Sequence, residues 1–93
     1  MILPDALLPL LDDEGRLKQW PSKRSIQLMA LDYLAAQFTS GQIYTEREVN
    51  AFLDRWHTFG DAALLRRELY ERGLLNREKD GSAYWSTPNT KML

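Results

Sequence analysis

The stretch "ALLRRELYERGLLNR", residues 63–77, contains the end of one regular element and the start of another. As far as Arg72 its apolar residues recur at helical spacing, and Gly73 suits the left-handed residue that follows a helix end. Beyond Gly73 the helical period stops, which indicates an extended segment. The adjacent Arg66 and Arg67 lie inside the predicted helix. Whether they meet a ligand or hold the helix to its neighbours decides what this chain can do.

Two more helices are predicted upstream. The sequence "YTEREVNAFLDRW" has Thr45 and Glu48 at the spacing of a capping box, followed by a helical apolar pattern. The sequence "PSKRSIQLMALDYLAAQF" has apolar residues at spacings of three and four, and Ser22 is its predicted N-cap. Asp61 is the predicted cap of the helix that contains the two arginines. The chain therefore has three consecutive amphipathic helices.

The segment after the third helix predicts a β-hairpin. "LLNRE", "KDGS" and "AYWS" have the character of strand, turn and strand, with Asp80-Gly81 in the turn. The break between the second and third helices is short and contains Gly60, as a helix-turn-helix requires. Ile43-Tyr44 is the predicted third strand beside the hairpin. The fold class is therefore mainly α with a small β-hairpin: a winged helix-turn-helix with a three-helix core plus wing.

The chain is long enough for one domain, and its charge is distributed unevenly along the sequence. Its 93 residues fit one domain, over residues 16–86, preceded by an acidic and apolar N-terminal arm, 1–15, and followed by a loose C-terminal tail, 87–93. The arm holds four acidic residues and no Lys or Arg, so it carries −4; since the whole chain carries −1, the rest carries +3. This mild basicity permits an anion-binding face, but it is well short of a strongly basic nucleic-acid footprint.

Composition argues against several classes of function. The chain has no Cys and one His, which leaves no disulfide framework and too few ligands for zinc. It has no apolar run near the roughly 20 residues that cross a membrane, and no Gly-rich phosphate loop. We therefore expect no enzyme activity, no cofactor, no metal and no membrane partner, and a cytoplasmic location. His57, at the end of the second helix, is interpreted as a helix cap and not as a catalytic base.

Six stretches carry a resemblance to a known family: "GRLKQWPSKR", "LDYLAAQF", "YTEREVN", "FGDAALLRREL", "GLLNR" and "DGSAYW". Together they cover about residues 15–85, in order and without large gaps. On these stretches the chain resembles the bacterial family DUF2087, a domain of unknown function. Members of that family are often joined to helix-turn-helix transcriptional regulators, and others stand alone. The resemblance implies a setting in gene regulation and brings no established activity, substrate or catalytic residue.

The two arginines differ in their predicted surroundings. Arg67 lies opposite the apolar line of the helix and within reach of Glu71, in a pair that contributes only about 0.2–0.5 kcal/mol and that a phosphate can displace. Glu68 and Arg72 have the spacing of a second such pair. Arg66 has no acid three or four positions away, so its partner lies outside its own helix. The alternatives are a ligand or DNA anion, and an acid on the second helix, which is favoured: Glu46, Glu48 or Asp54.

Lys23 and Arg24 form a second cationic pair, in the predicted first turn of the first helix. Free amides and the helix dipole attract anions there, and the same features disfavour cations. Two explanations stay open for these side chains. One is a phosphate site, and the other is pairing with the acidic residues 12–14.

Two functions follow from this architecture. The first is a DNA-binding winged-helix protein in bacterial transcriptional regulation, whose third helix enters the major groove of double-stranded DNA and which dimerises for affinity. Its expected contacts are Lys23, Arg24, Ala63, Leu64, Arg67, Tyr70 and Lys79, with Arg66 in a structural or anion-binding role. The alternative is a protein-interaction or dimerisation module that works beside a regulator without binding DNA, favoured by the balanced charge of the third helix and by the apolar arm. The first is preferred because fold and family setting agree.

Overall fold

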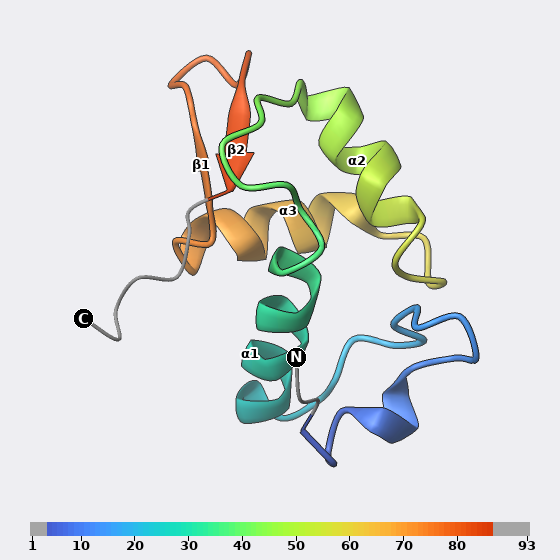
Figure 1. Cartoon of the computed structure of the whole chain (residues 1–93). Coiled ribbons are helices and arrows are strands. Elements are labelled where there is room, and N and C mark those ends of the chain that lie inside the picture. The colour runs from blue at the N-terminus through green and yellow to red at the C-terminus, as the bar shows by residue number, and fades with distance from the viewer. Residues whose placement is uncertain (1–3, 87–93) are drawn as a thin grey trace.

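Three α-helices and a β-hairpin form the framework of residues 4–86, the part of the chain that the computed structural model describes (Figure 1). Their mainly helical arrangement with a small β part is compatible with a winged helix-turn-helix, and this confirms the predicted fold class. The tail predicted over 87–93 lies outside the described residues. In chain order the elements are η1 (Leu8–Leu10), α1 (Arg24–Ala35), α2 (Glu46–Asp54), α3 (Ala62–Glu71), β1 (Leu75–Arg77) and β2 (Tyr84–Ser86).

Both ends of α3 are fixed by its own sequence. At its start, the Asp61 carboxylate accepts a hydrogen bond of 3.2 Å from the backbone N–H of Leu64. At its end, Gly73 has φ 83°, and the N–H of Leu74 donates to the Leu69 carbonyl at 2.9 Å. This is the bond pattern of a Schellman motif, which uses carbonyls that the helix end leaves free. The chain turns there into β1, so the helix end also sets the direction of the hairpin.

Of the N-caps predicted for the other two helices, one is confirmed and one is wrong. The capping box of α2 is confirmed, because the Glu48 N–H donates to Thr45 Oγ1 at 3.0 Å and the Thr45 N–H donates to Glu48 Oε1 at 2.9 Å. The prediction that Ser22 caps α1 is wrong: the N-cap is Lys23, with no side-chain hydrogen bond. The first helical bonds go to the carbonyl of Lys23, so Ser22 lies one residue too early to cap.

The hairpin packs beside the segment before α2. Its two strands are antiparallel and pair Asn76 with Trp85 at their centre. On the other side of β2, the Tyr44 N–H donates to the Tyr84 carbonyl at 2.8 Å, and the Tyr84 N–H donates to the Tyr44 carbonyl at 2.7 Å. The predicted pairing of Ile43-Tyr44 with the hairpin is therefore found as one isolated bridge at Tyr44. It ties the start of α2 to the wing.

The hydrophobic core draws on every part of the described chain, including the predicted arm. Leu7 is fully buried, and Leu17 joins the arm to the turn after α2. The Leu17 N–H donates to the Trp56 carbonyl at 2.8 Å, and its own carbonyl accepts from the Thr58 N–H at 3.0 Å. The buried apolar residues are Leu7, Leu17, Ala30, Leu31, Leu34, Phe38, Tyr44, Val49, Leu53, Leu65, Leu69, Leu75 and Tyr84.

Candidate functional site

A surface hollow of about 340 Å³ lies where α3, the start of α2 and the hairpin meet. Three arginines and two glutamates line it, so its side chains sum to +1. Two tyrosines complete the lining. We name it the arginine hollow, and its residues are Glu46, Arg66, Arg67, Tyr70, Glu71, Arg77 and Tyr84.

Arg66 is held by α2. Its Nη1 donates a hydrogen bond to Asn50 Oδ1, and its Nη2 lies 3.7 Å from Glu46 Oε2. The side chain is 18% exposed, as expected for an arginine whose stem packs at the flank of the apolar line. The prediction of an intramolecular partner on the second helix is confirmed, with Glu46 as the acid. Asn50 was missed as a partner, because nothing in its local sequence shows that it faces Arg66.

Arg67 is exposed and has no acidic partner within residues 4–86, where the ion-paired arginines are Arg16, Arg24 and Arg66. The expected pair with Glu71 is therefore not formed. The expected pair between Glu68 and Arg72 is also absent, because Glu68 turns toward α1 and binds Arg24 at 2.9 Å. The exposed guanidinium of Arg67 is left free at the rim of the arginine hollow.

Arg77 joins the hairpin to α3. Its guanidinium carbon lies 4.9 Å from the centre of the Tyr70 ring, a cation–π distance. Its Nη1 also donates to the Lys79 carbonyl at 3.4 Å. The expected DNA contacts included Lys79 but not Arg77, which lies two residues earlier in the hairpin. Arg77 lines the hollow, whereas the exposed Lys79 does not.

Glu46 lies among the donors of the hollow. Its Oε1 accepts a hydrogen bond of 3.4 Å from the Tyr84 hydroxyl, while its Oε2 faces Arg66. The wing turn approaches from the other side: a Cβ built on Gly81 would lie 3.6 Å from Glu46 Oε1 and 3.8 Å from Arg77 Nη1. The Glu46 side chain is 50% exposed. A half-exposed carboxylate thus contacts two groups that can bind an anion, Arg66 and the Tyr84 hydroxyl, with Arg77 in the same hollow.

The structure gathers only part of the predicted DNA-contacting set. Arg67 and Tyr70 meet in the arginine hollow with Arg66, and Tyr70 is 43% exposed. The other predicted contacts lie outside the lining. Of these, Lys23, Arg24, Ala63 and Lys79 are exposed and Leu64 is half-buried.

Arg24 is further removed from the predicted phosphate role because its guanidinium binds both Glu68 and Gln27. The alternative prediction, that Arg24 pairs with the acidic residues 12–14, is wrong, because its acidic partner is Glu68. Asp12 and Glu14 are occupied by Arg16, which lies in the same turn and needs no tertiary contact to reach them.

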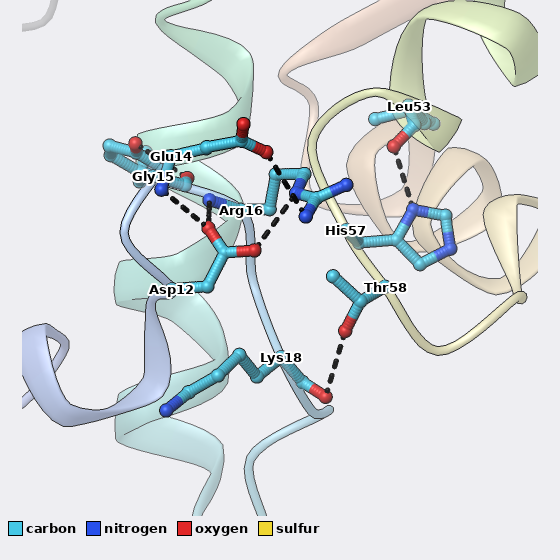
Figure 2. Close-up of polar contacts among 9 residues, drawn as sticks. Asp12, Glu14, Gly15, Arg16, Lys18, Leu53, His57 and Thr58 are labelled. Carbon is cyan, nitrogen blue, oxygen red and sulfur yellow. Dashed lines mark hydrogen bonds and ion pairs between the residues drawn. The ribbon is translucent and has the colours of Figure 1, made fainter.

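The start of α3, away from the hairpin, is fixed by His57, which is only 4% exposed. Figure 2 shows its ring beside the Leu53 carbonyl. Its Nδ1 lies 2.7 Å from the Leu53 carbonyl oxygen, and its Nε2 lies 2.9 Å from the Asp61 N–H nitrogen. A carbonyl only accepts, so Nδ1 carries the hydrogen; an N–H only donates, so Nε2 accepts. The cap predicted for His57 is confirmed, but it acts as a neutral ring through hydrogen bonds and not through positive charge.

The acidic turn of the arm is also self-contained (Figure 2). Asp12 Oδ1 accepts from the N–H groups of Arg16 and Glu14 at 2.8 and 2.9 Å, and Arg16 Nε donates to Oδ2 at 2.8 Å. These bonds, led by that from the Arg16 backbone, hold the pKa of Asp12 below 3.8. The Tyr33 hydroxyl donates to the Gly15 carbonyl at 2.8 Å, and burial together with nearby Asp12 raises the pKa of Tyr33. Two of the arm's four acidic side chains are thus paired within their own turn.

Residues 4–86 contain no helix long and apolar enough to cross a membrane, and no group of three or more side chains placed to hold a metal ion. Comparison with known families gives a match over residues 16–86, to a family described as an uncharacterized protein conserved in bacteria. Comparisons with curated proteins and with solved structures gave no match. Because the family match covers well over half of the chain, the chain belongs to the bacterial family DUF2087.

Proposed function

We propose that this protein binds double-stranded DNA through α3 and the hairpin and acts in bacterial transcriptional regulation. The observation that carries the proposal is the arginine hollow, where Arg66 and Arg67 of α3 meet Arg77 of β1. A winged helix that enters the major groove with its third helix turns this junction toward the sugar-phosphate backbone. Guanidinium groups with unused N–H donors are the side chains that best match phosphate oxygens.

Electrostatic attraction to DNA is local in this chain, since the net charge of the whole is −1. Three acids elsewhere are paired with arginines: Asp12 and Glu14 bind Arg16, and Glu68 binds Arg24. Arg67 and Arg77, which have no acidic partner within residues 4–86, both line the hollow. We therefore expect weak binding by one copy, strongly dependent on salt, and a gain from a second copy on a neighbouring half-site.

A second candidate function is a protein-interaction or dimerisation module, and the exposed ring of Tyr70 favours it. Tyrosine supplies much contact area for little conformational entropy, and Ala63 on the same helix is also exposed. The arm contributes less to this function than the sequence implied, because Leu7 is buried within its own molecule. Leu8 is the large apolar side chain of the described arm that stays exposed, at 50%.

Fluorescence anisotropy with a labelled duplex of mixed sequence tests the proposal. The wild type, Arg67→Ala and Arg72→Ala are titrated at several salt concentrations. Arg72 is the matched control, because it is an exposed arginine at the end of α3 that does not line the hollow. Arg67→Ala should weaken binding at every sequence tested and lower the salt slope by about 1.

Two results contradict this account of the site. If no duplex binds even at the lowest salt, DNA is not the ligand, and a rise in solution mass of the free protein would then support the protein-interaction module. If Arg72→Ala weakens binding as much as Arg67→Ala does, the attraction comes from overall charge and not from the arginine hollow.

A further inference from the structure

We infer that the Glu46 carboxylate occupies the anion position of the arginine hollow in the free protein, so that a DNA phosphate binds there only by displacing it. The inference rests on the proposed function for the identity of the ligand, a backbone phosphate. It adds that the protein limits its own affinity through one side chain. Glu46 thereby becomes an autoinhibitory residue of the site.

The position of the carboxylate is that of a bound anion. One of its oxygens faces Arg66 Nη2 at 3.7 Å, and the other accepts from the Tyr84 hydroxyl at 3.4 Å. Arg77 Nη1 lies near the same wing turn, since it and Glu46 Oε1 are both within 4 Å of the Cβ position of Gly81, but the two groups do not form an ion pair. Donors from α3 and β2 thus contact one acidic group at the start of α2, and the arginine of β1 lines the same hollow.

These contacts are long for charge-assisted bonds, which are usually 2.7–2.9 Å. The same molecule forms such short bonds elsewhere, at 2.8 Å between Arg16 and Asp12 and at 2.9 Å between Arg24 and Glu68. The Glu46 side chain is also 50% exposed, so it can rotate into solvent and be rehydrated. A weakly held, half-exposed carboxylate is the partner that a non-bridging oxygen of a DNA phosphodiester, which also carries one negative charge, can replace.

Displacing Glu46 would not release the arginine behind it. Arg66 Nη1 stays bound to Asn50 Oδ1, and its side chain is only 18% exposed, so its second nitrogen remains aimed at the hollow. Arg77 likewise stays stacked on Tyr70. The anion position is therefore held in place by neutral partners, while the carboxylate inside it is exchangeable.

The first test compares Glu46→Gln with Asp54→Asn by anisotropy with the same duplex. Both changes remove one negative charge from α2, but Asp54 lies at the far end of the helix and does not line the arginine hollow. Glu46→Gln should bind the duplex about three- to tenfold more tightly than the wild type, and Asp54→Asn should stay within about twofold. Glu46→Ala serves as a second variant, and circular dichroism confirms that each protein is folded. Unchanged or weaker binding by both Glu46 variants overturns the inference, while the proposed function still stands if the wild type binds.

The second test needs no DNA and uses inorganic phosphate as the probe. Thermal unfolding is followed in sodium phosphate and in sodium chloride at matched ionic strength. The phosphate-specific rise in melting temperature should be larger for Glu46→Gln than for the wild type and Asp54→Asn. Such a rise without duplex binding supports the anion position and contradicts DNA as its ligand. Equal rises in all three proteins mean that phosphate does not use this position, which overturns the inference.

Discussion

The two ends of α3 hold their polar groups in opposite ways. At its start, His57 is buried and makes hydrogen bonds of 2.7 and 2.9 Å to the end of α2 and to the cap of α3. Near the hairpin, the acid Glu46 makes contacts of 3.4 and 3.7 Å and is half exposed. One helix is therefore fixed to the fold at its beginning and left with exchangeable partners where it faces the wing.

This contrast predicts that side chains at the start of α3 contribute to stability, whereas exposed side chains near the wing contribute to ligand binding. A buried donor or acceptor that loses its partner costs about 1–3 kcal/mol, because water cannot replace the bond. A half-exposed carboxylate loses little when it leaves its partner, because solvent takes over. Substitutions at the start of α3 should therefore act on folding, and those of the exposed or half-exposed side chains of the arginine hollow, such as Arg67 and Glu46, should act mainly on ligand affinity.

The largest effect is expected for His57→Ala. It removes a buried ring and leaves the Asp61 N–H without its partner, and the Leu53 carbonyl keeps its bond from the Trp56 N–H. The free energy of unfolding should fall by about 2–4 kcal/mol, measured by urea denaturation. Thr58→Ala is the control, since its exposed hydroxyl makes only a bond of 3.5 Å to Lys18, and it should change stability by less than about 0.5 kcal/mol. If the two variants are equally stable, the turn is not the fixed end of the helix.

A smaller and more discriminating effect is expected from the adjacent arginines. Arg66→Ala removes a partner of both Asn50 and Glu46 and should lower the free energy of unfolding by about 1–3 kcal/mol. Arg67→Ala removes an exposed side chain and should stay within about 0.5 kcal/mol of the wild type while weakening DNA binding. Chemical denaturation together with anisotropy measures both properties. Equal losses of stability would show that Arg67 is held by the fold as Arg66 is, and would contradict its assignment as a free side chain.

Two glycines give a paired test of the wing. Gly81 has φ 77° and Gly41 has φ 82°, so alanine at either position should cost about 1–2 kcal/mol of backbone strain. A methyl group at Gly41 meets open space, whereas one at Gly81 lies beside Glu46 and Arg77. Thermal unfolding should show similar losses for both variants, and only Gly81→Ala should change duplex affinity. A change in affinity for Gly41→Ala would indicate an indirect effect of stability.

Most of what the sequence predicted correctly depends on neighbours along the chain. The capping box of Thr45 and Glu48 and the helix end at Gly73 are local patterns, and both formed as expected. The acidic partner of Arg66 was predictable as one of three residues, because its own helix offers no acid at the right spacing.

The contacts that sequence reasoning missed are set by how the elements pack. Glu68 has Arg72 four residues on, yet α3 presents it to α1, where Arg24 reaches it; its side chain is only 19% exposed. The stacking of Arg77 on Tyr70 depends on the direction in which the hairpin leaves α3. Helix crossing and hairpin direction do not follow from local spacing, and they decide which cations remain free.

The smallest predicted effect concerns the acidic turn of the arm. Because the folded pKa of Asp12 is lowered, its stabilising effect is fully present above its unfolded value near 3.8 and is lost as the pH falls through the folded pKa. The difference in melting temperature between wild type and Asp12→Asn should therefore be constant above about pH 5 and should shrink below it. Asp80, whose pKa is also lowered, by hydrogen bonds from Ser82, is present in both proteins and cancels in this difference. A difference that does not change with pH would contradict the bonds assigned to Asp12.

The most direct measurement is a titration of the isotope-labelled protein with a DNA duplex, followed by the shifts of its backbone amide signals in NMR spectra. If α3 and the wing form the binding face, the largest changes should fall on Arg67, Tyr70 and Gly81, and the amides of residues 56–61 should move little. Changes centred on residues 56–61, or no changes at low salt, would contradict the division of α3 into a fixed end and a binding end.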